Sequence, residues 1–153
     1  MLRSGATSNY YIDKYLFTTE PALLGRLARA LAPLLPAGIQ RVAGPVLGAV
    51  PLVTALALEA GVPMLIVRVD KAKEYGTAKQ IEGRLERGDR VALVEDVVTT
   101  GGAALNALAT LREAGADVLR VLAVVDREQG GAEAFRAAGV PFRALFTKTD
   151  LGL

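Results

Sequence analysis

Two adjacent carboxylates, Glu95 and Asp96, end an apolar run and are followed closely by hydroxyls and glycines. Residues 91–103 read Val-Ala-Leu-Val-Glu-Asp-Val-Val-Thr-Thr-Gly-Gly-Ala. A buried strand of an α/β sheet delivers such residues to the sheet edge at which ligands bind. The glycines beyond it allow a tight turn, so that free amides at the start of the next helix can surround a phosphate. Carboxylates beside a phosphate cradle suit a ribose 5-phosphate, because the sugar hydroxyls donate hydrogen bonds while the phosphate accepts them.

The parts of this segment have simpler interpretations when they are taken one at a time. An acidic pair at a strand end can cap a helix, bind a metal ion or face solvent. A glycine pair can simply allow a strand-to-helix turn to pack closely. The ordinary turn does not require an acidic pair just upstream, however, so the combination favours the ribose phosphate site.

The composition narrows the chemistry further. The sequence contains no cysteine and no histidine, which excludes disulfides, thiolate metal sites and the commonest general base. Catalysis must therefore use carboxylates, lysine, arginine, hydroxyls and backbone amides. The formal net charge is +2 and is spread along the chain. That distribution suits local sites for small anions better than a nucleic-acid surface.

The length of 153 residues predicts one domain that spans residues 1–153. Charged residues, glycine and proline interrupt every apolar stretch before it reaches the roughly 20 residues of a membrane helix. The N-terminal residues carry no signal-peptide pattern, so we expect a cytoplasmic protein.

Runs rich in β-branched residues alternate with alanine-rich segments of helical spacing. This alternation predicts an α/β fold with a central, mostly parallel sheet flanked by helices. Residues 70–87 are polar and charged and read as a long excursion, a type of loop that is usually functional or disordered. The expected strands lie near residues 41–43, 64–69, from 91 to the acidic pair, 118–125 and 142–146, and the expected helices near 21–35, 52–61, 103–114 and 132–138.

Four segments in the same order resemble the type I phosphoribosyltransferase family and, within it, the orotate phosphoribosyltransferases. Residues 91–103 resemble the family's signature for 5-phosphoribosyl 1-pyrophosphate (PRPP). The resemblance implies the type I phosphoribosyltransferase fold, with a small N-terminal hood and a long mobile catalytic loop. The other segments are residues 3–5 with 8–13 for the N-terminal substrate segment, 71–77 with 81–83 for the catalytic loop, and 125–128 for the strand end that grips orotate.

The resemblance also assigns roles in PRPP binding. Glu95 and Asp96 would hold the ribose hydroxyls and support positive charge that develops on the sugar. Lys73 would stabilise the departing pyrophosphate when the loop closes and excludes water. Residues 46–50 match the family's pyrophosphate loop, although by themselves they equally fit a turn that leads into a helix. The remaining PRPP-binding residues implied are Arg3, Arg68, Lys71, Tyr75, Val97, Val98, Thr99, Thr100, Gly101, Gly102 and Ala103.

The orotate site would centre on Arg127. A planar guanidinium suits a planar substrate carboxylate, because it donates two parallel hydrogen bonds. By resemblance Thr99 helps to hold the base, and Tyr11 and Ile12 line its pocket. Each residue also has an ordinary interpretation: Arg127 as a surface arginine between acidic neighbours, and Tyr11 and Ile12 as packing residues.

Four departures and alternatives accompany these assignments. The lysine-rich stretch around Lys73 would be a solvated charged face in most proteins. For Arg3, the alternative to a binding role is disorder of the N-terminus. The family places the catalytic lysine four residues after the arginine, whereas Arg68 and Lys73 are five apart. Either a bulge absorbs the extra residue or Lys71 takes the place of the second family lysine. The family usually has a helix before residues 3–5, so we expect a shorter variant or a different start.

The resemblance implies transfer of ribose 5-phosphate from PRPP to N1 of orotate, which gives orotidine 5′-monophosphate and pyrophosphate in pyrimidine biosynthesis. Mg²⁺ would be held mainly by substrate and water, with no direct protein ligand. A homodimer that shares the catalytic loop is expected, without nucleic acid or membrane as partners. The alternatives are a phosphoribosyltransferase for a purine base and a non-catalytic PRPP-binding regulator. A generic dinucleotide-binding domain is disfavoured because the first strand lacks a Gly-x-Gly-x-x-Gly turn.

Overall fold

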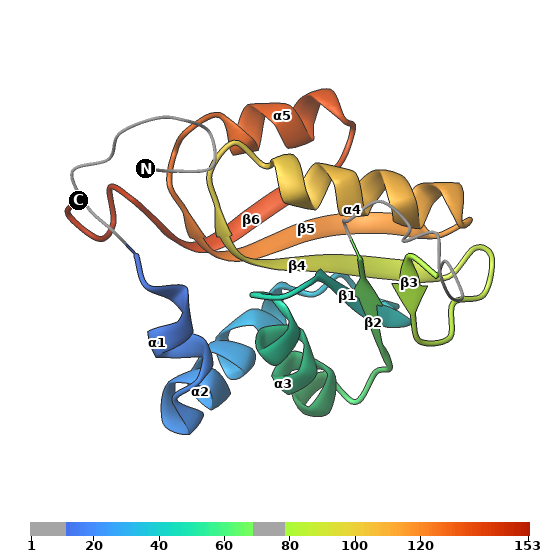
Figure 1. Ribbon diagram of the computed structural model, residues 1–153, viewed down its shortest axis with the longest axis horizontal. Helices are drawn as coiled ribbons and strands as arrows, with labels where there is room; N and C mark the ends of the chain where they lie inside the picture. Colours follow the sequence, from blue (N-terminus) through green and yellow to red (C-terminus); the bar gives the residue numbers. More distant parts are fainter. Residues whose placement is uncertain (1–11, 69–78) are drawn as a thin grey trace.

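The computed structural model describes residues 12–68 and 79–153 and contains one sheet between two layers of helices (Figure 1). The sheet has six strands in the order β3-β2-β1-β4-β5-β6. All neighbouring strands are parallel except β2 and β3, which are antiparallel. The strands are β1 (Arg41–Pro45), β2 (Met64–Val67), β3 (Ile81–Glu82), β4 (Arg90–Val98), β5 (Asp117–Asp126) and β6 (Phe142–Thr147).

The helices cover both faces of the sheet. In Figure 1, α1, α2 and α3 lie on one side and α4 and α5 on the other. Among the described residues, no helix is long and apolar enough to cross a membrane. The helices are α1 (Lys14–Thr18), α2 (Pro21–Leu31) with a short 3₁₀ continuation (Ala32–Leu34), α3 (Val50–Ala60), α4 (Gly102–Glu113) and α5 (Gly131–Ala137).

Local residues set the ends of these helices. Pro21 is the first residue of α2, where its missing N–H costs no hydrogen bond, and the Glu20 side chain accepts from Ala22 N at 3.4 Å. Gly61 ends α3 in the left-handed conformation with φ of 67°. Gly101 precedes α4 with φ of 88°, so this strand-to-helix turn depends on glycine.

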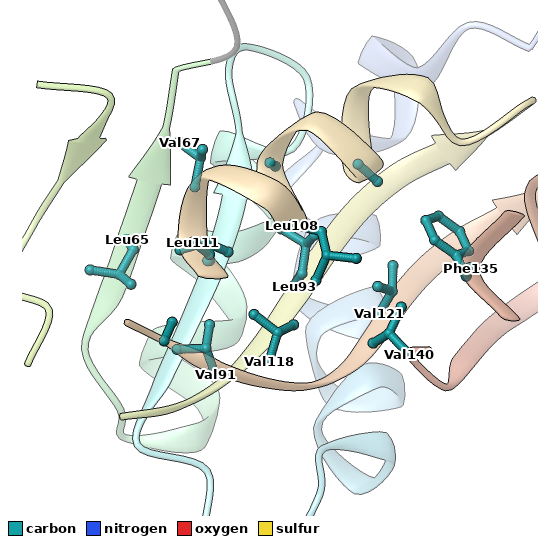
Figure 2. Packing of buried hydrophobic residues seen from close by; sticks show 14 of the residues in the cluster. Leu65, Val67, Val91, Leu93, Leu108, Leu111, Val118, Val121, Phe135 and Val140 are labelled. Atoms are coloured by element: carbon teal, nitrogen blue, oxygen red, sulfur yellow. The ribbon is translucent and has the colours of Figure 1, made fainter. Parts of the chain in front are cut away.

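Two apolar clusters, one on each face, hold the layers together. The first joins α4 and α5 to the sheet and contains the fully buried Phe135 (Figure 2). The second joins α2 and α3 to the opposite face through Leu31, Leu52 and Leu56. β1, β4 and β5 contribute apolar residues to both clusters, as expected of parallel strands that are covered on both faces.

The predicted fold class is confirmed, with differences at short elements. Within the expected excursion of residues 70–87, Ile81 and Glu82 form the edge strand β3, which is too short to produce a period-two pattern. The helix α1 was not predicted, since five residues are too few to establish helical spacing. Strand β2 ends at Val67 rather than at residue 69, and α3 starts at Val50, earlier than expected.

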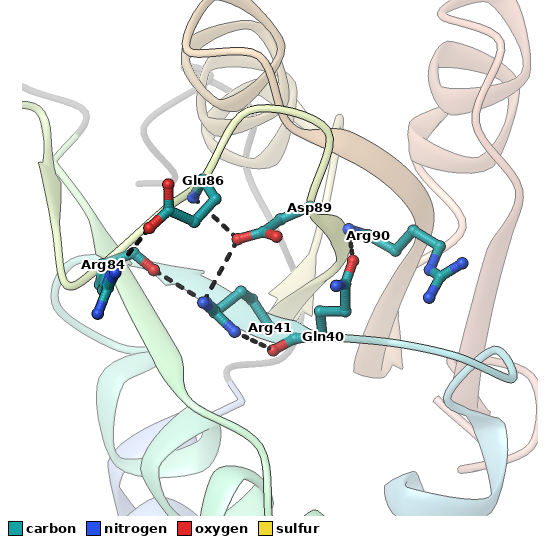
Figure 3. A network of polar contacts seen from close by, with 6 residues as sticks. All are labelled: Gln40, Arg41, Arg84, Glu86, Asp89 and Arg90. Carbon is teal, nitrogen blue, oxygen red and sulfur yellow. Dashed lines mark hydrogen bonds and ion pairs between the residues drawn. The ribbon is translucent and has the colours of Figure 1, made fainter.

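The amino edge of the sheet is tied together by a polar network (Figure 3). Arg41 Nε donates to the Arg84 carbonyl at 2.8 Å, and Arg41 Nη2 lies 3.5 Å from Asp89 Oδ2. The same Asp89 oxygen accepts from Glu86 N at 2.9 Å. These contacts fix the chain that returns from β3 to the start of β4, and the network also includes Gln40 and Arg90.

Candidate active site

The carboxyl edge of the sheet contains a topological switch point between β1 and β4. The chain leaves β1 through α3, on one face, and leaves β4 through α4, on the other face (Figure 1). The two strands are neighbours in the sheet and their connections diverge, which is the position at which α/β proteins bind ligands. The segments that border it are residues 46–49 after β1 and residues 99–101 after β4.

Glu95 and Asp96 lie in contact near the end of β4. The Asp96 backbone N–H donates to Glu95 Oε1 at 3.1 Å, and the Val97 N–H donates to Asp96 Oδ1 at 2.7 Å. Backbone donors therefore satisfy one oxygen of each carboxylate. Asp96 Oδ2 is buried and has no hydrogen-bond partner among the residues that the structure describes.

Strand alternation is interrupted at this dyad. Val94 and Val97 both pack into the cluster on the α2 and α3 side, although a regular strand would point them to opposite faces. Val98 packs on the α4 side, as Leu93 does. The change of side falls between Val94 and Val97, where Glu95 and Asp96 stand.

The dyad is buried, whereas the sequence predicts carboxylates that a ligand can reach. Glu95 is 7% and Asp96 1% exposed. Lys14 Nζ of α1 lies 3.3 Å from Asp96 Oδ2. Gly48 lies against the same place, because a Cβ built on it would overlap Asp96 Oδ2 and lie 2.8 Å from Lys14 Nζ. Lys14 and the 46–49 loop thus cover Asp96.

Burial raises the pKa of the Glu95 carboxyl well above its ordinary value. The negative charge of Asp96 and a side-chain hydrogen bond with it act in the same direction. The hydrogen bond from the Asp96 N–H and the Lys14 ammonium lower this pKa without cancelling the rise. Glu95 consequently binds a proton more tightly than an isolated glutamate side chain does.

The turn after β4 has the features of a phosphate site. Thr100, Gly102 and Ala103 are exposed, and within residues 12–68 and 79–153 no side chain caps the start of α4. The first intrahelical hydrogen bond of the turn runs from Leu105 N to the Gly101 carbonyl, so the preceding amides remain available to an anion. Thr99, Val98 and Gly101 also belong to this turn; Thr99 is half-buried, whereas Val98 and Gly101 are buried.

Helix α5 supports this turn from behind. A Cβ on Gly131 would overlap the Val98 side chain and lie 3.0 Å from the Thr99 carbonyl oxygen. Only glycine permits this approach, so the first residue of α5 helps to fix the position of the phosphate turn.

Arg68 stands at the end of β2, beside the 46–49 loop. Its backbone N–H donates to the Gln80 carbonyl at 2.7 Å, so the two ends of the segment between β2 and β3 meet. Its guanidinium Nε lies 3.5 Å from Glu82 Oε1. The neighbouring Val67 carbonyl accepts from Val46 N at 2.9 Å, which ties the 46–49 loop to this strand end.

Arg127 follows β5 and lies next to the phosphate turn. Its backbone N–H donates to the Val98 carbonyl at 2.9 Å, and the residue is 4% exposed. Asp126 and Glu128 hold this turn, because Asp126 Oδ1 accepts from Glu128 N at 2.9 Å. Thr99 and Arg127, predicted from separate segments, are therefore brought together.

The structure thus gathers the strand ends of β2, β1, β4 and β5 at one edge. Ile12 is half-buried and packs against the cluster of α2 and α3. Lys14 was missed by the sequence analysis; its only signal was its place next to Asp13, the last residue of the N-terminal motif. Five predicted site residues lie outside the described residues: Arg3, Tyr11, Lys71, Lys73 and Tyr75.

The carboxyl edge of the sheet offers few side-chain ligands for a metal ion. Within residues 12–68 and 79–153, no group of three or more His, Cys, Asp or Glu side chains could hold a metal ion. The two dyad carboxylates are candidate donors, and Asp96 Oδ2 accepts no hydrogen bond from the described residues. Such a pair suits the water ligands of a hydrated Mg²⁺ better than a protein cage.

Comparison with known proteins agrees with this geometry. The profile of the phosphoribosyl transferase domain matches residues 21–135. An orotate phosphoribosyltransferase of Halobacterium salinarum is 52% identical over 150 residues, which cover 98% of this chain and 85% of that protein.

Two solved structures are similar along nearly the whole chain. Orotate phosphoribosyltransferase of Aeropyrum pernix has a TM-score of 0.84 at 30% identity, covering 97% of this chain and 84% of that one. The Mycobacterium tuberculosis H37Rv enzyme in complex with PRPP has a TM-score of 0.78 at 38% identity, covering 99% and 88%. The resemblance inferred from the sequence is therefore confirmed, and the chain belongs to the phosphoribosyltransferase family, among the orotate phosphoribosyltransferases.

Proposed function

We propose that Glu95 and Asp96 hold the ribose hydroxyls of PRPP while this chain transfers ribose 5-phosphate to N1 of orotate. The reaction releases pyrophosphate and forms orotidine 5′-monophosphate, a step of pyrimidine biosynthesis. The observation that carries the residue assignment is the contact between the carboxylate pair and an uncapped helix start at the switch point. Acceptors for a diol and donors for a phosphate lie within one turn of chain.

The phosphate turn would bind the 5′-phosphate of PRPP. The backbone amides after Gly101 supply donors, and the N-terminus of α4 adds favourable partial charge. Val97, Val98, Thr99, Thr100, Gly101, Gly102 and Ala103 make up this cradle in the proposal.

Reaching the dyad requires a local change. Because Glu95 and Asp96 are buried, PRPP must part the 46–49 loop from Asp96. This loop can move away from Asp96 at low cost, because the Leu47 side chain is 67% exposed and Gly48 has no side chain that must be displaced. A crystal soaked with orotidine 5′-monophosphate would test the requirement directly, because the ribose must then contact both carboxylates.

Leaving-group stabilisation is the main catalytic demand. Breaking the C1–O bond places charge on pyrophosphate, and cations that meet this charge lower the barrier. We assign this role to Lys73, with Arg68, Lys71, Tyr75 and Arg3 as further contacts of the pyrophosphate or phosphate. Arg68 is supported by its place at the strand end beside the 46–49 loop.

Orotate would bind beside the phosphate turn. Arg127 is proposed to pair with the orotate carboxylate, and Thr99, Tyr11 and Ile12 to border the ring. The hydrogen bond from Arg127 N to the Val98 carbonyl supports this assignment, because it keeps Arg127 next to Thr99. A base without a carboxylate leaves the arginine without its ligand, which disfavours purines.

Mg²⁺ would bind mainly through substrate oxygens and water, with Glu95 and Asp96 nearby as acceptors for its water ligands. When bound, it neutralises charge on the pyrophosphate. The chain's own residues orient the ribose and keep water from the reacting carbon.

We further propose that residues 1–153 form one catalytic unit that works as a cytoplasmic homodimer in which the segment after β2 reaches the neighbouring site. Exposed apolar side chains such as Leu16, at 70%, and Leu47 are available for a dimer contact. Light scattering after size exclusion would test whether the chain is a dimer. Mixing one variant that is inactive in the segment after β2 with another that is inactive elsewhere in the site would test whether the segment is shared. If it is, mixed dimers contain one intact site and recover activity.

The decisive experiment is an assay of the purified chain with PRPP, Mg²⁺ and orotate, followed by the loss of orotate absorbance. Parallel reactions contain uracil, hypoxanthine or adenine. We expect product only with orotate. Turnover of a purine would overturn the base assignment, and PRPP binding in calorimetry without any turnover would indicate the regulatory alternative.

A further inference from the structure

Lys14 is a positively charged residue at the dyad that the sequence motifs do not assign. It lies in α1, which is fixed by Asp13 at its start, where Asp13 Oδ1 accepts from Tyr15 N at 3.1 Å. The buried Thr18 Oγ1 donates to the Lys14 carbonyl at 2.9 Å. The backbone at Lys14 is thus held at both ends of a single helical turn.

The ammonium group faces the most buried charge of the site. Lys14 Nζ lies 3.3 Å from Asp96 Oδ2, and the Asp96 side chain is 1% exposed. Burying a carboxylate costs free energy unless a positive charge lies beside it, and in the described part of the chain the other Asp96 oxygen accepts a hydrogen bond from the Val97 N–H. Lys14 supplies that charge and holds Oδ2 toward the 46–49 loop.

The position of the ammonium also matters for the loop. Residues 46–49 contain no charged side chain, yet an anionic pyrophosphate is expected there. Lys14 Nζ lies against Gly48 of this loop and 5.6 Å from the centroid of the Tyr15 ring. The side chain is 38% exposed, so it can follow an incoming ligand without leaving the site.

Other charged groups around the dyad are few. Asp126 and Arg127 stand at the end of β5, and the start of α4 has no charged residue in Gly102, Ala103 and Ala104. Among the described residues, Lys14 is the cation paired with the dyad.

We propose that Lys14 is a positioning residue that holds the Asp96 side chain in its orientation and gives the PRPP site a positive charge that the 46–49 loop lacks. This rests on the proposed role of the dyad in holding the ribose. Removal of the charge therefore weakens PRPP binding more than it slows turnover, and it leaves orotate binding unchanged.

The test compares Lys14→Met, Lys14→Arg, Asp96→Asn and the double variant Lys14→Met/Asp96→Asn. Arg26→Met removes an exposed charge from α2 and is the control for net charge. Steady-state rates give KM and kcat for each substrate, calorimetry gives the Kd of PRPP with Mg²⁺, and thermal melting verifies the fold.

We expect Lys14→Met to raise KM and Kd for PRPP about tenfold while kcat changes less than about threefold. Lys14→Arg should restore most of the affinity. In the Asp96→Asn background, Lys14→Met should add little further effect, because the two residues act together.

Three outcomes overturn the proposal: PRPP affinity in Lys14→Met within twofold of the parent, tighter PRPP binding in that variant, or an undiminished effect in the Asp96→Asn background. If Asp96→Asn itself leaves PRPP binding unchanged, the proposed role of the dyad fails first, and this inference fails with it.

Discussion

The two edges of the sheet differ in how completely their buried carboxylates are hydrogen-bonded. At the amino edge, Asp89 accepts a backbone hydrogen bond and faces Arg41, whose guanidinium also donates to two carbonyls (Figure 3). At the carboxyl edge, Glu95 and Asp96 are buried side by side, and Asp96 Oδ2 faces the Lys14 ammonium at 3.3 Å but accepts no hydrogen bond from the described part of the chain. Proteins retain such incompletely satisfied groups where a ligand completes them. The contrast indicates that the amino edge contributes stability and the carboxyl edge binding.

The largest effect should come from Lys73, in the segment that starts at the carboxyl end of β2. We expect Lys73→Ala to lower kcat about a thousandfold, roughly 4 kcal/mol of transition-state stabilisation, because its proposed contact strengthens as pyrophosphate leaves. Stopped assays with excess enzyme would measure it. Lys79→Ala, at an exposed position beyond this segment, is the control; equal rates in the two variants would refute the role of Lys73.

Gly48→Ala should disturb the carboxyl edge alone. The added methyl group overlaps Asp96 Oδ2 and meets Lys14, so either the loop or the dyad must move. We expect kcat/KM for PRPP to fall about a hundredfold, or nearly 3 kcal/mol. Gly25→Ala in α2 is the matched control, since its Cβ meets only the end of the Arg29 side chain, at 3.4 Å. Wild-type activity in Gly48→Ala would show that the close approach is not needed.

Arg127→Ala should separate the two substrates. Loss of a paired, charge-assisted contact is expected to weaken orotate binding by about 2 kcal/mol, or thirtyfold, with a much smaller change for PRPP. Calorimetry with each ligand would measure both affinities. Arg127→Lys keeps the charge but not the parallel donors and should be intermediate. Equal weakening of both ligands would contradict the orotate assignment.

Asp89→Ala should break the amino edge and leave the active site intact. The substitution removes the acceptor for Glu86 N and the partner of Arg41, which should lower the free energy of unfolding by about 1–3 kcal/mol. Urea titration would measure this loss, with the exposed Glu59→Ala as control. The activity of Asp89→Ala is measured well below its melting midpoint. The contrast between the two edges fails if the loss in kcat/KM, expressed as a free energy, exceeds the loss in the free energy of unfolding.

Glu95→Gln should have the smallest effect and the opposite sign on stability. The pKa of Glu95 is raised in the folded protein, so its protonated form stabilises the fold below the unfolded pKa, near 4.3, and this contribution is lost as pH rises through the folded pKa. Glutamine avoids that loss. We expect the variant to melt about 2–4 °C above the parent at neutral pH, with a difference that shrinks toward pH 4, while activity falls.

Melting curves across this pH range would give the result for Glu95→Gln. A lower melting midpoint at neutral pH, or a difference that does not vary with pH, would contradict the assignment of the raised pKa. Either result would also weaken the contrast between the two edges, since the buried Glu95 carboxylate would then not lower the free energy of unfolding.

The sequence was most informative where the site is contiguous. The strand, the acidic pair and the phosphate turn follow one another along β4 and α4, so local patterning was enough to predict their arrangement. The alternation of strands and helices likewise predicted the layered sheet, because its crossovers are regular. The short elements α1 and β3 escaped prediction, since each has too few residues to show a period.

Contacts between distant segments could not be predicted in the same way. Nothing in the residues around Lys14 indicates that its ammonium faces Asp96, because that pairing depends on how α1 lies beside the end of β4. The same is true of Gly48 and Gly131, whose missing side chains matter only because other segments approach them. The burial of the dyad also depends on this packing.

The sequence by itself determined the chemistry available to this protein: carboxylates, a glycine turn and cations, without histidine or cysteine, in an order typical of PRPP-binding proteins. The tertiary structure decided which of these groups meet, how deeply the dyad is buried and which cation faces it. The physical reason is that residue types and short-range spacing fix local conformation and bonding capacity, whereas desolvation and charge pairing depend on neighbours that are far apart along the chain.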